Sequence, residues 1–188
     1  MKMSKIIHAW SILDKLYFRC SRLEFVDEQR DNIFRVRLLT YRGPSLSFED
    51  GTTIQSSDLL LKIHLHNYRL MKEMESIDHD IKRALYVYQR VKQSLPGLAH
   101  FFVNHPQCDD IKALLGITVL NRGVKPLGFQ VSKISNPAYR TLKGWFQLPM
   151  MMLLQPHKRL TLLKKGPLAP NYLMMTKEQL VNRYFKVK

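Results

Sequence analysis

The stretch that decides the fold runs from residue 50 to residue 67 and reads DGTTIQSSDLLLKIHLHN. Its opening pair, Asp50-Gly51, is a turn signal. Three apolar residues, Leu61, Ile63 and Leu65, then alternate with polar ones, which is the two-residue period of a strand with one face on a core. We expect the other face to meet water or a ligand, and a long helical pattern begins at or just after Asn67.

A second strand is predicted upstream, at residues 33–41, where apolar residues alternate with Arg35 and Arg37. A short strand at 46–48 leads into the Asp50-Gly51 turn, so a hairpin is expected there. If the strands at 33–41 and 59–66 share one sheet, their polar faces combine into a basic surface. That surface is a candidate anion site, because guanidinium groups bind phosphate and carboxylate. The alternative is that these residues only form the solvent-exposed polar face of an antiparallel sheet. The candidate ligand-binding residues are Arg35, Arg37, Lys62, His64 and His66.

Helical periodicity covers residues 67–95, with an interruption predicted near Ser76, and Ser94 with Pro96 predicts a further short helix. Residues 114–120 and 127–134 read as a hairpin with a longer loop. Residues 4–20 predict an N-terminal helix, Asn136-Pro137 begins another, and Thr176 caps a C-terminal one. We therefore predict a single α+β domain over residues 1–188. Its mainly antiparallel sheet of about four to five strands packs on the long helix, with helices at both ends.

The charge of the chain is large and uneven. It totals 30 lysines and arginines against 15 acids, a net charge of +15. Residues 121–188 hold 13 of the basic residues and one acid, Glu178, and so carry +12 of that charge. This split indicates an anionic partner for the last third. Anionic lipid, an acidic polymer and nucleic acid all qualify, although no nucleic-acid-reading motif is present.

The same third joins aromatic and methionine side chains to a cationic stretch. Such a combination suits a surface that dips into an anionic bilayer. The alternative is a core helix followed by a basic loop. The candidate membrane-binding residues are Trp145, Phe146, Met150, Met151, Lys158, Arg159, Lys164 and Lys165.

Two cysteines far apart, Cys20 and Cys108, form no disulfide framework and fit a reducing compartment. The N-terminus lacks a signal-peptide pattern, and the longest uncharged apolar stretch, residues 144–156, is too short to span a bilayer. These features predict a cytoplasmic location, with the protein either free or peripheral on the membrane.

Catalytic candidates are few. His64 and His66 project the same way from one strand, and Asp58 or Glu49 could join them as a base or metal pair. A zinc site needs a third and usually a fourth ligand, and no HExxH or CxxC motif supplies them. No dinucleotide fingerprint, phosphate loop or nucleophile elbow is present either, so we expect no metal and no cofactor.

Several short stretches, taken in order, resemble the YkoP-like family of bacterial proteins. They are Tyr41-Arg42-Gly43, Leu46 with Asp50-Gly51-Thr52, Asp58 with residues 62–67, and residues 116–120, 127–129 and 175–180. A similar domain is found appended to polysaccharide deacetylases, so the resemblance implies a cell-envelope or polysaccharide context. It implies no activity. Family members often carry an acid at the position of His64, which weighs against a histidine mechanism.

Three functions remain open from the sequence. The first is a non-catalytic accessory module at the envelope or the cytoplasmic membrane face that binds an anionic ligand. The second is an enzyme, a hydrolase or transferase, acting on an envelope or polysaccharide precursor through a His/acid site. The third is nucleic-acid binding. The sequence identifies no protein partner.

Overall fold

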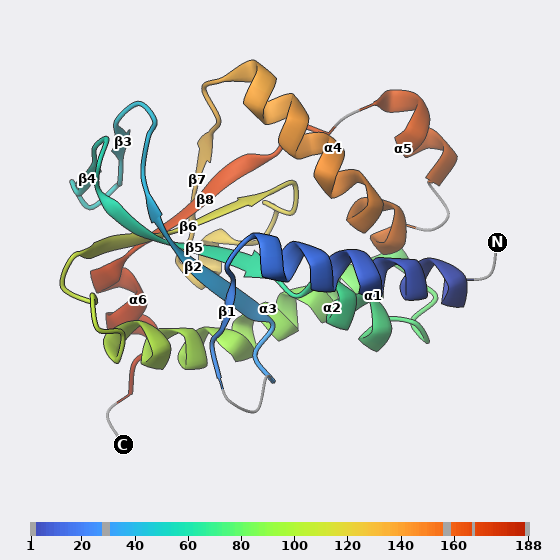
Figure 1. Ribbon diagram of the computed structural model, residues 1–188, viewed down its shortest axis with the longest axis horizontal. Coiled ribbons are helices and arrows are strands. Elements are labelled where there is room, and N and C mark those ends of the chain that lie inside the picture. Colours follow the sequence, from blue (N-terminus) through green and yellow to red (C-terminus); the bar gives the residue numbers. More distant parts are fainter. Residues whose placement is uncertain (1–2, 28–30, 156–158, 167, 187–188) are drawn as a thin grey trace.

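A six-stranded sheet forms the centre of the computed structural model, which describes residues 3–27, 31–155, 159–166 and 168–186. The strand order is β1-β2-β5-β6-β8-β7, and every neighbouring pair is antiparallel except β5 with β6 (Figure 1). A separate two-stranded hairpin, β3–β4, lies over one end of the sheet. The strands are β1 (Glu24–Phe25), β2 (Phe34–Thr40), β3 (Leu46–Ser47), β4 (Thr53–Ile54), β5 (Leu59–Leu65), β6 (Ile111–Thr118), β7 (Gln130–Lys133) and β8 (Asn171–Thr176).

Helices cover both faces of this sheet. On one face, α3 and α6 pack on the main apolar core, which includes Phe34, Leu61, Leu98 and Leu180. On the other face lie α1 and α4 (Figure 1). The helices are α1 (Met3–Cys20), α2 (Asn67–Glu73), α3 (Asp80–Val103), α4 (Pro137–Leu154), α5 (Arg159–Lys165) and α6 (Lys177–Tyr184), with a 3-10 turn, η1, at Lys125–Leu127. The predicted α+β class and mainly antiparallel sheet are confirmed. The main sheet has six strands where about four to five were expected, because β1 and β8 also pair in it.

The two strands read first from the sequence are direct neighbours. β2 and β5 pair antiparallel, with Arg35 opposite His64 and Arg37 opposite Lys62. Directly opposite residues of an antiparallel pair point to the same face. The predicted combination of the two polar faces is therefore confirmed, and the apolar residues between them face the α3 side.

The helical stretch after Asn67 is interrupted as predicted, between α2 and α3. The expected new helix at Ser94 and Pro96 is wrong, because α3 continues through Pro96 to Val103. Burial explains the continuation. Leu95 and Leu98 are fully buried in this part of α3, and the Ser94 hydroxyl accepts from the backbone N–H of Ile33. This packing offsets the hydrogen bond that proline cannot make.

The predicted hairpin between 114–120 and 127–134 is also wrong, because β8 lies between β6 and β7 and pairs with both. β8 and the two-residue β1 are the strands of the main sheet that sequence reasoning missed. The residues of β8 lead directly into Thr176, whose side chain accepts from Gln179 N as the cap of α6. The helix-start signal was found, whereas the strand before it, with buried Leu173 to Thr176 and no alternation, was not.

The second face of the sheet is divided between two covers. At one end the β3–β4 hairpin places Leu46, Phe48 and Ile54 on Leu60 and Leu115 of the sheet. This hairpin turns at Asp50-Gly51 as predicted, with Gly51 at φ +85°. The other end lies under α1 and α4. The polar residues of β2 and β5 lie at this second end, and the candidate site is built there.

Candidate anion-binding site

The polar face of β2 and β5 is covered rather than open. Arg35 and Lys62 each keep only 5% of their surface exposed, because α1 and α4 lie over them. The expectation that this face meets water is therefore wrong for its central residues. Covering such a face requires partners for its charges, because an unpaired charge is costly to bury. The five predicted residues differ in whether they have such a partner.

Arg35 is neutralised by α1. Its Nη1 and Nη2 donate to the two carboxylate oxygens of Asp14 at 3.0 and 2.9 Å. The rings of Phe18 and Phe25 lie 4.9 and 5.3 Å from the guanidinium carbon. Such two-point pairing with aromatic stacking is what arginine geometry favours. Arg35 therefore attaches α1 to the sheet, and its buried Nε has no hydrogen-bond partner in the described part of the chain.

The two histidines lie under the same helix and carry no charge at neutral pH. The Tyr17 hydroxyl is 3.4 Å from His64 Nδ1, and Asp14 Oδ2 is 3.6 Å from His66 Nε2. Burial, together with the cations Lys62 and Arg37, lowers the pKa of His64 to about 3. Burial, with Arg35 next, lowers the pKa of His66 to about 4. The two imidazoles therefore act as neutral hydrogen-bonding groups.

Three cations remain, and we call Arg37, Lys62 and Lys143 the cation cluster. Arg37 lies opposite Lys62 in the β2–β5 register, and Lys143 reaches them from α4. Burial, together with the positive charges of Lys143 and Arg37, lowers the pKa of Lys62 to about 8. The pKa of Lys143 is lowered for the same reasons, burial first and then Arg37.

No carboxylate whose side chain the structure describes lies within ion-pair distance of the cation cluster. Arg37 Nη1 donates to the Ser21 carbonyl at 3.3 Å, but its buried Nε has no hydrogen-bond partner in the described part of the chain. The same holds for His64 Nε2. Like charges opposite one another destabilise a sheet. An anion placed here would remove that repulsion and supply an acceptor for the unpaired donors.

Neutral side chains from both covering helices surround the cluster. Tyr17 of α1 is half exposed beside His64, and Tyr139 of α4 lies close enough to Tyr17 and Arg37 for both to shift its pKa. Burial is the first cause of the raised pKa of Tyr139, so its phenol keeps its proton. Lys143 Nζ lies 5.2 Å from the centre of the Tyr139 ring. The arrangement provides positive charge with hydroxyl and imidazole groups, which suits a small anion such as phosphate.

The predicted catalytic residues are not brought together. Asp58 lies at the start of β5, six residues before His64, which is about 20 Å along a strand. Its carboxylate pairs with Lys112 at 2.9 Å and accepts from Gln55 N. Glu49 is exposed in the β3–β4 turn. In the described residues no group of three or more His, Cys, Asp or Glu side chains could hold a metal ion.

The predicted membrane-binding residues are divided by the structure. Trp145 and Phe146 are exposed on α4, and Lys164 is exposed on α5. Met150 is buried against α2, and Met151 is partly buried there. The Met150 side chain is therefore not exposed for contact with a membrane. Lys158 lies outside the described residues, as do the side chains of Arg159 and Lys165.

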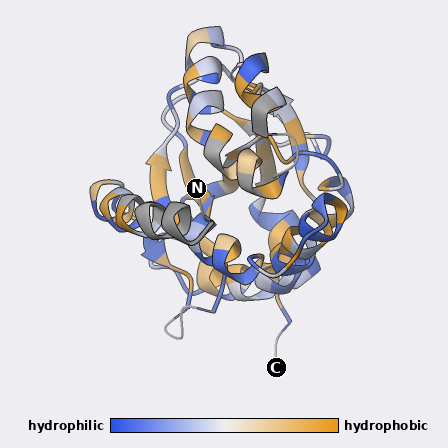
Figure 2. Ribbon diagram, turned by 90° about the vertical axis from the view of Figure 1, so that its right-hand side faces the viewer, coloured by the Kyte–Doolittle hydropathy of each residue, from blue (hydrophilic) through white to orange (hydrophobic). Residues whose placement is uncertain are grey.

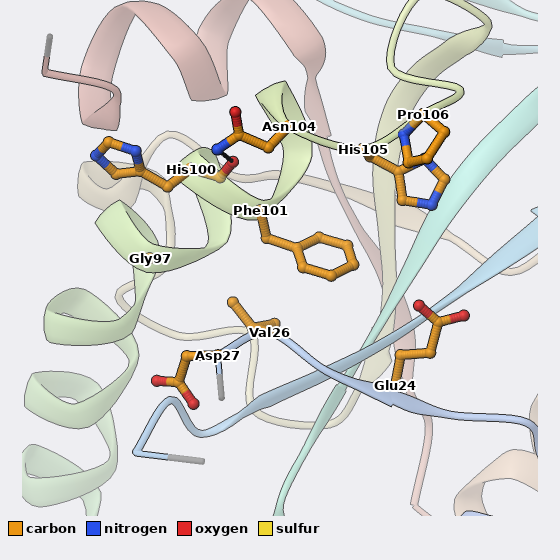
Figure 3. A pocket seen from close by; sticks show the side chains of 9 residues that line it. All are labelled: Glu24, Val26, Asp27, Gly97, His100, Phe101, Asn104, His105 and Pro106. Carbon is orange, nitrogen blue, oxygen red and sulfur yellow. Dashed lines mark hydrogen bonds between the residues drawn. The ribbon is translucent and has the colours of Figure 1, made fainter. Parts of the chain in front are cut away.

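A separate pocket of about 580 Å³ lies between β1 and the C-terminal end of α3 (Figure 3). Phe101 and Val26 project into it, with Glu24, Asp27 and His105 around them (Figure 3). None of the predicted site residues lines this pocket. It is therefore distinct from the cation cluster.

Sequence reasoning missed the residues that the helices bring to the site: Asp14, Tyr17, Tyr139 and Lys143. One signal was available. Tyr139, Lys143 and Phe146 follow a spacing of four and three, which places them on one side of a helix. Nothing in that spacing indicates which sheet residues they meet.

Comparison with known proteins gives one consistent result. A family model described as the YkoP domain matches residues 3–184. A protein of Bacillus subtilis (strain 168) named "Uncharacterized protein YkoP" is 38% identical to this chain over 177 residues. The aligned residues cover 94% of each of the two chains. No solved structure matches.

Proposed function

From the premise that this chain belongs to the YkoP domain family, as its sequence predicts, we propose that it is a non-catalytic accessory module that binds an anionic ligand. We place its action at the cell envelope or the cytoplasmic face of the membrane. The observation that carries the proposal is Lys62, which is almost fully buried beside Arg37 and Lys143 with no described carboxylate in reach.

The energetics favour a ligand over a purely structural role. A buried ion pair such as Arg35 with Asp14 stabilises the fold only if its charges are compensated. Lys62 has no such compensation, and a methionine there would fill similar space without the cost of desolvation. A group that is costly in the free protein becomes useful when a partner of opposite charge arrives. A bound anion would supply that partner.

The ligand group that fits is small and negatively charged. The cluster lies under two helices, so it suits one phosphate or carboxylate group rather than a run of phosphates. A nucleic-acid backbone calls for cations along an open groove. An enzyme reaction through His64 and Asp58 has no geometric support, because Asp58 pairs with Lys112 at the far end of β5.

The test is titration of the full chain with inorganic phosphate and pyrophosphate in a calorimeter at pH 7. We expect saturable binding at one site, and a loss of about tenfold or more in affinity for Lys62→Met and for Lys143→Met, since each removes a charge-assisted contact. Lys133→Met, which changes an exposed lysine on β7, is the matched control. Equal affinities in all four proteins would overturn the proposed site.

Proton uptake gives a second, independent readout. An anion beside Lys62 raises the pKa of its ammonium back from about 8. Binding at pH 8 must then draw protons from the buffer, and the measured heat must depend on the ionisation enthalpy of the buffer. The dependence should be weaker in the Lys62→Met protein if the anion lies at the cation cluster, where Lys143 remains with its own lowered pKa.

A further inference from the structure

Large apolar side chains are exposed on the outer sides of both helices that cover the cluster. On α4, Leu142, Trp145 and Phe146 are 52%, 51% and 69% exposed, and on α1, Ile12 and Leu16 are each 60% exposed. Each set follows helical spacing, so its members lie side by side on one helix surface. We call these five residues the apolar rim. Contiguous exposed apolar groups mark interaction surfaces more often than isolated ones do.

The apolar rim and the cation cluster belong to the same two helices. Lys143 Nζ lies 5.9 Å from the ring centre of Phe146, and Tyr17, one residue after Leu16, contacts His64. Figure 2 shows α1 apart from the α4–α5 pair within this layer, and both parts carry hydrophobic residues. An anionic group at the cluster could therefore belong to a molecule whose apolar part contacts the rim.

We propose that the α1 and α4 surface docks on an anionic lipid bilayer, and that the cation cluster takes the phosphate of a lipid headgroup between the two helices. This inference rests on the proposed function and names its ligand class, a phosphate-bearing lipid. It adds Ile12 and Leu16 of α1 to the candidate membrane-binding residues predicted from the sequence, all of which lie in the last third of the chain.

Charge complementarity selects a lipid surface as the occupant. Lys15 and Arg19 are exposed on α1 next to the rim, and Lys164 is exposed on α5. Amphipathic helices with an aromatic residue and flanking cations bind at the boundary of headgroups and acyl chains. A second copy of the chain would bring the same cations and a net charge of +15 against this surface. An anionic bilayer neutralises these cations and accepts the apolar side chains at once.

Docking of this kind reaches only the headgroup region of the bilayer. Within the described residues no helix is long and apolar enough to cross a membrane. Trp145, on the outer side of α4, would then sit at headgroup depth, where indole rings are enriched. Its fluorescence therefore reports insertion, provided that Trp10 is replaced by phenylalanine so that one tryptophan remains.

The experiment is co-sedimentation of the full chain with three kinds of vesicle: phosphatidylcholine alone, phosphatidylcholine with phosphatidylserine, and phosphatidylcholine with phosphatidic acid. We expect no binding to the first, binding to the second and the tightest binding to the third, whose phosphomonoester carries the most charge. Two rim variants, Ile12→Gln/Leu16→Gln and Trp145→Gln/Phe146→Gln, should each lose about tenfold or more in affinity. Free phosphate at saturating concentration should remove the preference for phosphatidic acid.

The matched control is Ile81→Gln/Leu85→Gln, which changes two apolar residues that are 84% and 56% exposed on α3, across the sheet from the rim. It should bind vesicles like the natural chain. Failure of the natural chain to bind anionic vesicles, or an equal loss in the α3 variant, overturns the inference.

The two proposals fail separately. Phosphate binding without vesicle binding leaves the anion site standing and removes the lipid. Vesicle binding with no response to Lys62→Met and no competition by phosphate removes the headgroup from the cluster and overturns the inference, while the proposed anion site still depends on the calorimetric titration.

Discussion

Lys62 lowers the free energy of unfolding of the ligand-free protein. Its folded pKa of about 8 lies below its ordinary value of 10.5, because burial and two neighbouring cations oppose its charge. Below about pH 8 both the folded and the unfolded chain hold the proton, so the full penalty acts on the folded state. Between about pH 8 and 10.5 the unfolded chain binds more protons than the folded one. The Lys62 contribution to the free energy of unfolding therefore rises with pH across that window.

Replacing Lys62 should accordingly stabilise the protein while abolishing anion binding. We expect Lys62→Met to raise the free energy of unfolding at pH 7 by about 2 kcal/mol, with the gain shrinking as the pH approaches 10.5. Urea titrations at several pH values, in buffers without phosphate or sulfate, measure this. Lys133→Met should change the value by less than about 0.5 kcal/mol. A Lys62→Met protein that is less stable at every pH would show that the ammonium has a stabilising partner.

At the scale of single elements, α4 is held close to the chain that leads into β8. A Cβ added at Gly144 would lie 1.9 Å from the Leu168 carbonyl oxygen, a backbone atom that cannot swing away. Arg140, four residues earlier, donates through Nε to the Pro170 carbonyl at 3.0 Å. Glycine in the middle of this helix therefore serves close approach, and the approach places Lys143 over the sheet.

Gly144→Ala tests this approach through the sign of its effect. In a free helix alanine is favoured over glycine by about 1 kcal/mol. Here we expect a loss of about 1–3 kcal/mol, because the helix must move away from Leu168. Thermal and urea unfolding of Gly144→Ala should be compared with Thr141→Ala, at an exposed site on the same helix. A Gly144→Ala protein that is more stable than the natural chain would contradict the close packing. If α4 positions the cation cluster, the affinity of Gly144→Ala for phosphate should fall together with its stability.

The whole molecule has three layers, and they differ in how they are held. α3 and α6 meet the sheet through a continuous apolar core, whereas α1 meets it through the pairing of Asp14 with Arg35 and the rings around them. Among its described side chains, α1 also places Tyr17 against His64, but none of them belongs to the main apolar core. A layer held in this way can open locally while the core stays folded. The anion site lies under that layer, so docking of α1 and occupancy of the site are expected to be linked.

Asp14→Asn should release α1 without unfolding the rest. Removing one partner of a buried ion pair costs about 3 kcal/mol or more. Hydrogen exchange should accelerate in the amides of α1 and much less in those of α3. The double variant Asp14→Leu/Arg35→Met should restore slow exchange in α1, since no unpaired charge remains there. Equal acceleration in both helices would show that the layers unfold together.

The sequence by itself determined the elements whose signals are local. The alternation of residues 59–65 and 34–40, the Asp50-Gly51 turn, and the caps Asn136 and Thr176 were all readable because period and cap chemistry lie within a few residues. Five polar residues on one sheet face followed from that alternation alone.

Only the tertiary structure decided what that face does. Asp14, which is 21 residues away in the sequence, neutralises Arg35, and burial keeps His64 and His66 uncharged. Lys143 comes from α4 to join Arg37 and Lys62 of the sheet. β8 separates β6 from β7 in the same way, through pairing that no local period records. Charge state and burial depend on what packs across a surface, and those partners are distant in sequence, so a basic strand face became a covered cation cluster.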